Sequence, residues 1–179
     1  MVYLIVFLPL LGSIIAGFWG RRLGDKLSLY LTSTLLLISM TLSWITFWQL
    51  SSNHVDKVYP LMEWMNVGDF NVVWSLRHDM LSAVMMIVIT TVSAMVHIYS
   101  IGYMSHDNSK PRFMSYLSLF TFAMLMLVTS DNLIQLFFGW EGVGLASYLL
   151  IGFWYHKPSA HTAATVSYTH LTLPTIGCV

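Results

Sequence analysis

The residue best suited to do chemistry is Glu141, a single carboxylate inside a long apolar stretch. The stretch spans residues 131–155 and reads DNLIQLFFGWEGVGLASYLLIGFWY. A helix rises about 1.5 Å per residue, so Glu141 lies roughly 15 Å from Asp131, near the midplane of a hydrocarbon core about 30 Å thick. A charge there costs on the order of 3 kcal/mol, and such acids tend to lie on ion or proton pathways. We therefore predict that Glu141 carries protons; a role in packing alone is the alternative.

The neighbours of Glu141 favour a change in its protonation. On a helical wheel, the small and polar residues of this stretch gather on one side: Asn132, Gln135, Gly139, Gly142 and Ala146. Glu141 lies nearly opposite, among apolar and aromatic residues: Ile134, Phe137, Leu145 and Tyr148. Apolar surroundings disfavour the carboxylate anion and a nearby ammonium favours it, so a cation that moves in or out would switch the proton on and off. The glycines of FFGWEGVG leave room for local distortion or water beside the carboxyl.

A second candidate, His97, belongs to a polar stripe along another expected helix, residues 79–101. At about 100° per residue, the polar side chains of this helix fall within about 80° of one another: Asp79, Ser82, Thr90, Ser93, His97 and Ser100. Such a stripe cannot face lipid without a free-energy cost, so it faces other helices or a water-filled path. His97 is either a member of a proton relay or polar gate, or a packing residue bonded to a neighbour's carbonyl.

Two further polar features have structural explanations. Asp79 follows Arg77 at the expected edge of the membrane, where a carboxylate complements the helix dipole and pairs with the arginine. The expected helix over residues 27–50 carries five hydroxyls within a sector of about 60°: Ser28, Thr32, Ser39, Ser43 and Thr46. We expect these hydroxyls to bond carbonyls of their own helix while the stripe packs against a neighbour.

The composition indicates a membrane protein without redox centres of its own. Hydrophobic residues make up 56% of the chain and charged residues only 9%, far from the balance of a soluble domain. The net charge is zero and no basic block occurs, which argues against a nucleic-acid partner. The single cysteine, Cys178, excludes an internal disulfide and a multi-cysteine metal or iron–sulfur site, and His170 is too distant to complete one. We expect no cofactor and no metal in this chain.

Five spans and one hairpin organise the chain. We expect an all-α fold, a polytopic membrane helix bundle, with transmembrane helices over residues 2–20, 27–50, 79–101, 113–129 and 131–155. The first run lacks a basic segment before it and is too long for a typical signal sequence, so we expect a retained helix. The fourth helix is rich in methionine and is expected to serve packing. Between the second and third helices, a turn at residues 66–69 followed by β-formers predicts a small extramembrane hairpin.

The basic residues orient this bundle. Six of them fall on the side reached after the first, third and fifth helices: Arg21, Arg22, Lys26, Lys110, Arg112 and Lys157. The other side has only Lys57 and Arg77. Because cytoplasmic loops are enriched in lysine and arginine, the first side is expected to face the cytoplasm or matrix. The N-terminus and the hairpin are then outside.

Two long segments resemble one known family. Residues 78–104 read HDMLSAVMMIVITTVSAMVHIYSIGYM. Together with residues 131–155, they closely resemble the antiporter-like membrane subunit of respiratory complex I, NADH-quinone oxidoreductase subunit L, and the resemblance covers about residues 1–160. It implies an all-helical subunit with many spans that translocates protons while electrons pass from NADH to quinone in other subunits. It also implies that Glu141 is the key acid and that His97 takes part in the polar path.

The same resemblance implies partners and a location. The partners are other membrane subunits of complex I, the lipid bilayer and protons, without direct NADH binding. The location is a bacterial inner (plasma) membrane, with the mitochondrial inner membrane as the alternative. The family's lysine partner for the glutamate lies on a later helix that this sequence does not contain.

The end of the chain departs from the family. The segment TAATVSYTHLTLPTIGCV is rich in threonine and has no apolar run of spanning length. We expect residues 1–161 to be the N-terminal transmembrane part of the subunit and residues 162–179 to be an unrelated or disordered tail. A chain of this kind would be a fragment and would not pump protons alone.

Other functions remain open at this stage. A multi-subunit sodium/proton antiporter or a membrane-bound hydrogenase contains related subunits that also use a buried acid. A non-catalytic assembly module, in which Glu141 merely pairs with a neighbour, is the third alternative.

Overall fold

Five helices in the computed structural model are long and apolar enough to cross a membrane. The structure describes residues 1–53, 56–68, 70–107 and 109–171. Within these ranges the candidate spans lie in five helices: α1 (Val2–Leu23), α2 (Asp25–Asn53), α3 (Met80–Tyr103), α4 (Lys110–Val128) and α5 (Leu133–Ile151). The predicted all-α, polytopic bundle with five spans is confirmed.

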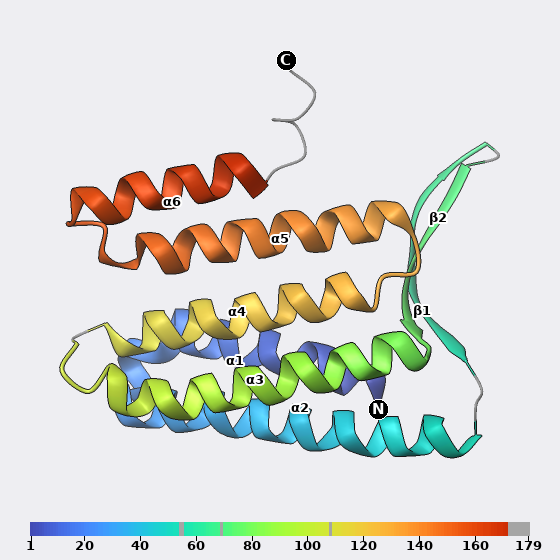
Figure 1. Ribbon diagram of the computed structural model, residues 1–179, viewed down its shortest axis with the longest axis horizontal. Helices are drawn as coiled ribbons and strands as arrows, with labels where there is room; N and C mark the ends of the chain where they lie inside the picture. The colour runs from blue at the N-terminus through green and yellow to red at the C-terminus, as the bar shows by residue number, and fades with distance from the viewer. Residues whose placement is uncertain (54–55, 69, 108, 172–179) are drawn as a thin grey trace.

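The helices form a bundle of four with two more stacked outward. α2 and α4 contact each other, and α1 and α3 each pack against both. α5 packs on α4, and α6 (Pro158–Leu171) packs on α5 after a short 3-10 turn, η1 (Gly152–Trp154). Figure 1 shows α4 between the first helices and α5, with α6 on the far side of α5. α4 is therefore the helix that joins the two parts of the bundle.

The helix ends follow local chemistry. α4 begins three residues earlier than predicted, because Pro111 lies in its first turn, where a missing N–H costs nothing. α5 begins two residues later than predicted, because the Asn132 side chain caps it by accepting from the Gln135 backbone N–H at 2.8 Å.

The predicted hairpin is present and lies at one end of the bundle. β1 (Lys57–Val67) pairs antiparallel with β2 (Phe70–His78), and Gly68 has a φ of +61°, which suits glycine at the turn. β1 contains Pro60, and the register shifts just after it, as expected for a residue that donates no hydrogen bond to a ladder. A two-stranded sheet is marginal alone, so it depends on docking to the helices.

The docking site is the turn between α4 and α5. Asn132, which caps α5, also donates its side-chain amide to the Val73 carbonyl at 2.9 Å. Ser75 donates its backbone N–H to Gln135 Oε1 at 3.1 Å and its hydroxyl to Asp131 at 3.1 Å. The start of α5 is thus held by β2, at the end of the bundle where α1 begins (Figure 1).

The hydroxyl stripe of α2 is a packing surface, as predicted. All five of its hydroxyl residues are buried. Thr32 and Ser43 donate to carbonyls of their own helix, at 3.0 and 2.9 Å. Ser39 instead donates to the Ile5 carbonyl of α1 at 2.8 Å, which ties the two helices together. Four of the five hydroxyls thus have a partner within the protein, whereas the buried Ser28 hydroxyl lacks one among the described residues.

α6 is a helix that the sequence analysis did not predict. It runs antiparallel to α5, and Ser147 and Ser167 join the two helices with their hydroxyls 3.1 Å apart. The tail predicted for residues 162–179 falls partly on this helix and partly on residues 172–179, which lie outside the described part of the chain. The division of the chain after residue 161 stays a prediction.

The small residues of α5 face α4, as the helical wheel predicted. A Cβ added at Gly139 would lie 2.7 Å from the Leu127 Cα, a backbone atom that cannot turn away. At Gly142 the corresponding neighbour is the Ala123 Cβ at 3.3 Å. α4 and α5 therefore pack backbone to backbone near Gly139.

Gly139→Ala should destabilise the chain by about 1–3 kcal/mol, because the added methyl group must push α4 and α5 apart. Gly142→Ala should cost less. Gly102→Ala is the matched control, since nothing lies within 4 Å of a Cβ there. Thermal unfolding in detergent micelles measures the three variants, and equal melting temperatures for Gly139→Ala and Gly102→Ala would contradict this packing.

Asp79 has the predicted structural role at the start of α3. Its carboxylate accepts from the Ser82 backbone N–H at 2.8 Å and pairs with Arg77 at 3.1 Å, while the Ser82 hydroxyl accepts from the Asp79 N–H. The Ser82 backbone N–H is the main reason that the pKa of Asp79 lies below its usual range. A lowered pKa means that the ionised carboxylate stabilises the fold above its ordinary pKa of about 3.9, and that this stability is lost as the pH falls through the lowered value.

Asp79→Ala should lose about 1 kcal/mol of stability at neutral pH, the usual value of an N-cap. The difference in stability between the variant and the parent chain should become smaller in acid, because Asp79 becomes protonated in the parent. Asp79→Asn retains a capping oxygen and is expected to show a smaller loss at neutral pH. Unfolding curves between pH 3 and pH 7 test this, and a deficit that does not change with pH would argue against the ionised cap.

Candidate functional site

His97 is fully buried on the face of α3 that meets α4. Its Nδ1 lies 2.8 Å from the Ser93 carbonyl, and its Nε2 lies 3.1 Å from the Ser118 hydroxyl of α4. A carbonyl can only accept, so the neutral imidazole carries its hydrogen on Nδ1 and donates it to Ser93. Nε2 is then an acceptor, and Ser118 donates to it.

The hydrogen bonds continue from His97 into a cluster of four side chains. The Ser93 hydroxyl lies 3.4 Å from His97 Nδ1 and 2.5 Å from the Thr121 hydroxyl, which also lies 3.0 Å from the Leu117 carbonyl. We call Ser93, His97, Ser118 and Thr121 the His97 cluster. It joins α3 to α4 with groups that can each donate and accept a proton.

A second polar contact joins α4 to α1. The Ser115 hydroxyl donates to the Ser13 carbonyl at 2.8 Å, and the two hydroxyls are 3.3 Å apart. α4 therefore carries hydroxyls at residues 115, 118 and 121, one helical turn apart, that bond to two different helices. The sequence analysis missed this feature because it described the fourth helix by its methionines, although the three-residue spacing of its hydroxyls was visible.

Glu141 lies on α5, away from the interface with α4. Its side chain is half-buried, and Oε1 is shielded from solvent without a hydrogen-bond partner among the described residues. Neither of the two ion pairs found in the described part of the chain includes it. An unpaired buried carboxyl oxygen carries a desolvation cost, so Glu141 is a position where a proton or a cation would be stabilising.

The structure does not bring the two predicted site residues together. His97 belongs to the α3–α4 interface, and Glu141 belongs to α5 on the other side of α4 (Figure 1). Any path between them has to pass α4. No three histidine, cysteine, aspartate or glutamate side chains within the described ranges gather as a metal site would need.

Two known families match the chain. The family described as the N-terminus of chain 5 of NADH-ubiquinone oxidoreductase (complex I) matches residues 64–114. The family described as the transmembrane region of NADH:quinone oxidoreductase and Mrp antiporters matches residues 130–174. The two matches include both predicted site residues.

Curated relatives are similar along most of this chain. NADH-quinone oxidoreductase subunit L of Rhodobacter capsulatus is 53% identical over 173 residues, which cover 92% of this chain and 24% of the relative. NADH-ubiquinone oxidoreductase chain 5 of Arabidopsis thaliana is 52% identical over 164 residues, with the same coverage. The chain thus spans about a quarter of the length of these relatives.

A solved structure has the same fold. The membrane-bound sulfane sulfur reductase, an archaeal respiratory membrane complex, contains a chain that superposes with a TM-score of 0.75 at 15% identity. The match covers 93% of this chain and 33% of the other. With its five candidate spans, this chain is thus similar over 92% of its length to NADH-quinone oxidoreductase subunit L and NADH-ubiquinone oxidoreductase chain 5, at about half identity.

Proposed function

We propose that this chain is part of a proton-translocating membrane subunit of NADH:quinone oxidoreductase, in which Glu141 takes up and releases protons. Electron transfer takes place in other subunits, and this chain binds neither NADH nor a redox cofactor. The observation that carries the proposal is the shielded Glu141 Oε1, which lacks a hydrogen-bond partner among the described residues in the middle of a spanning helix. Relatives named as complex I subunits support the assignment.

The proposed mechanism follows from the electrostatics of a carboxyl in apolar surroundings. A lone carboxylate anion in apolar surroundings loses its hydration, which favours the neutral acid as long as no cation is near. When a positive charge approaches, the anion is stabilised and the proton leaves. Movement of that charge in step with electron transfer would convert the redox energy into proton movement across the membrane.

The His97 cluster supplies groups through which a proton could pass between α3 and α4. Nε2 of His97 can accept a proton from the Ser118 side, and Nδ1 can release one toward the Ser93 hydroxyl, 3.4 Å away. The Ser93 hydroxyl is in turn bonded to Thr121. The cluster thus provides donors and acceptors at both ring nitrogens, which a relay needs.

The chain's surroundings follow from the same assignment. Its partners are the other membrane subunits of complex I, the lipid bilayer and the transported protons, in a bacterial inner membrane. The basic loops after α1, α3 and α5 lie at the end of the bundle opposite to the hairpin (Figure 1). By the positive-inside rule this end faces the cytoplasm, which leaves the N-terminus and the hairpin outside.

A second candidate function is ion exchange in a multi-subunit sodium/proton antiporter. The observation that favours it is the family match over residues 130–174, whose description includes Mrp antiporters. That match contains Glu141 but not His97. Measuring proton movement with and without sodium separates the two functions.

Glu141→Gln, made at the equivalent position of a full-length homologue, should abolish proton uptake through this subunit, because the amide cannot carry a proton. The assay reconstitutes the purified complex into vesicles and follows proton uptake alongside NADH oxidation. Glu63→Gln is the matched control, since Glu63 is an exposed carboxylate on β1, outside the spans. Undiminished proton uptake per NADH in Glu141→Gln would reject the carrier role and leave an assembly role.

His97→Ala should slow proton uptake by at least several-fold while the complex still assembles, since the variant removes the only ring nitrogens of the cluster. Ser118→Ala should have a smaller effect, because water can replace one hydroxyl donor. Thr34→Ala is the control, as Thr34 is a hydroxyl residue on the exposed face of α2. Loss of the assembled complex on a native gel, without any slowed but intact form, would instead assign His97 to packing.

A further inference from the structure

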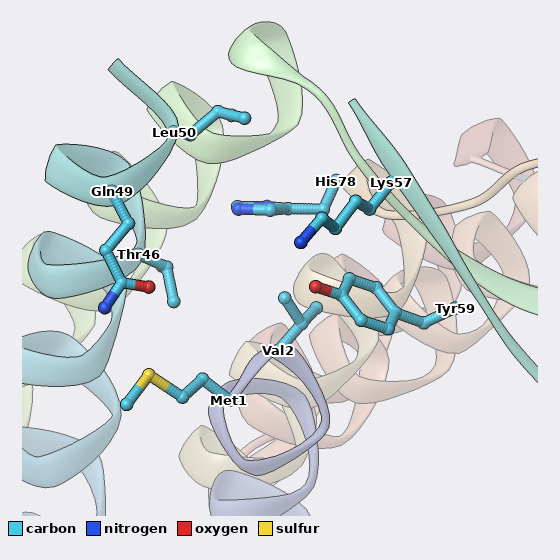
Figure 2. A pocket seen from close by; sticks show the side chains of 8 residues that line it. All are labelled: Met1, Val2, Thr46, Gln49, Leu50, Lys57, Tyr59 and His78. Atoms are coloured by element: carbon cyan, nitrogen blue, oxygen red, sulfur yellow. The ribbon is translucent and has the colours of Figure 1, made fainter. Parts of the chain in front are cut away.

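A cavity at the hairpin end of the bundle is lined by polar groups that the proposed function does not use. Figure 2 shows it between the start of α1, the end of α2 and the hairpin. Its volume is about 450 Å³, and its lining comes from Met1, Val2, Thr46, Gln49, Leu50, Lys57, Tyr59 and His78. The cavity lies where α1 begins and α2 ends, which in a membrane is the level of the lipid headgroups.

His78 is the buried polar group of this cavity. Its side chain is only 6% exposed, and its Nδ1 has no hydrogen-bond partner among the described residues. Figure 2 shows the imidazole reaching into the space between α2 and the hairpin. Buried polar atoms in proteins are nearly always bonded, so an unpaired ring nitrogen that lines a cavity indicates a missing ligand or water.

The charged side chain that lines the cavity is positive. The Lys57 ammonium lies beside the His78 ring in Figure 2. The carboxylates that act on His78, Asp56 and Asp79, are outside the cavity lining. A pocket whose lining holds an ammonium group and an imidazole, but no carboxylate, favours an anion.

The remaining lining fits an anion that also carries a carbon chain. The Tyr59 hydroxyl points into the space as a hydrogen-bond donor (Figure 2). Val2 and Leu50 form an apolar wall beside them, and both are buried core residues of the bundle. Polar and apolar groups thus meet in one cavity, as they do where a phosphate group joins a lipid.

We propose that this cavity binds a phosphate group, held by the Lys57 ammonium and the His78 imidazole. Two sources share this chemistry, namely the headgroup of an anionic phospholipid and free inorganic phosphate. The site is separate from Glu141 and from the His97 cluster, and it would anchor the hairpin to the membrane surface.

Binding should take up a proton at His78. Burial is the main cause that lowers the pKa of His78 below its ordinary value. The charged groups that also act on this imidazole are Asp79, Asp56, Lys57 and the amino terminus. The empty site therefore holds a neutral imidazole at pH 7. A bound anion stabilises the imidazolium and raises this pKa. The affinity for the phosphate group therefore increases as the pH falls from 7 toward 5.5.

The test uses the full chain, purified and delipidated in a maltoside detergent without phosphate. Dihexanoyl phosphatidylglycerol and inorganic phosphate are titrated separately, and binding is followed by phosphorus NMR. We expect saturable binding of at least one probe, stronger at pH 5.5 than at pH 7, and weakened five-fold or more in Lys57→Gln. Lys26→Gln is the matched control, because it removes the same charge from an exposed position at the opposite end of the bundle.

Each outcome decides a specific point. Saturable binding of the lipid alone assigns the site to a headgroup, and equal binding of inorganic phosphate assigns it to the free anion. No saturable binding of either probe, or equal weakening in Lys57→Gln and Lys26→Gln, overturns the proposal. Nitrogen NMR of the parent chain gives an independent check. The His78 signal is identified as the histidine signal that disappears in His78→Phe. This signal must shift toward the imidazolium when the probe binds, and an unchanged signal also overturns the proposal.

Discussion

The constraint on which this structure depends is that polar groups inside a hydrocarbon layer must find their partners within the protein. The helices satisfy their backbones internally, and four of the five hydroxyls of the α2 stripe bond carbonyls of their own helix or that of Ile5 on α1. His97 is satisfied by Ser93 and Ser118. Glu141 departs from this pattern, since a shielded oxygen of its carboxyl is left without a partner among the described residues. A few other buried polar atoms of the spans, such as the Ser28 and Thr91 hydroxyls, lack a partner there as well.

The central position of α4 follows from the same constraint. Its hydroxyls bond α1 on one side and α3 on another, and its backbone approaches α5 at Gly139. Polar bonds and close backbone packing are the two interactions that hold helices together where lipid removes the hydrophobic driving force. One helix thus separates His97 from Glu141 and also connects the elements that carry them, so a structural change in either part of the bundle must involve α4.

The hairpin completes the bundle at one end. β2 bonds the turn that caps α5, through Asn132 and Gln135, and its last residue, His78, lines a cavity with the beginning of α1. The segment that fixes where the Glu141 helix begins is therefore also part of the proposed phosphate site. Phosphate binding at the hairpin would therefore act on the same contacts that set the position of Glu141.

The sequence by itself determined the number and type of the elements, because the length of an apolar run and the period of its polar residues are local properties. The five spans, the hairpin turn at Gly68, the α2 stripe and the glycine face of α5 could all be predicted in this way. The buried stripe with His97 could be predicted for the same reason. Only the tertiary structure decided which helices meet: that Ser118 and Thr121 bond to the His97 stripe, that α4 separates the two candidate residues, and that His78 and Lys57 line one cavity. These pairings join residues far apart in the chain, and helix periodicity shows which face of a helix is buried without showing what lies against it.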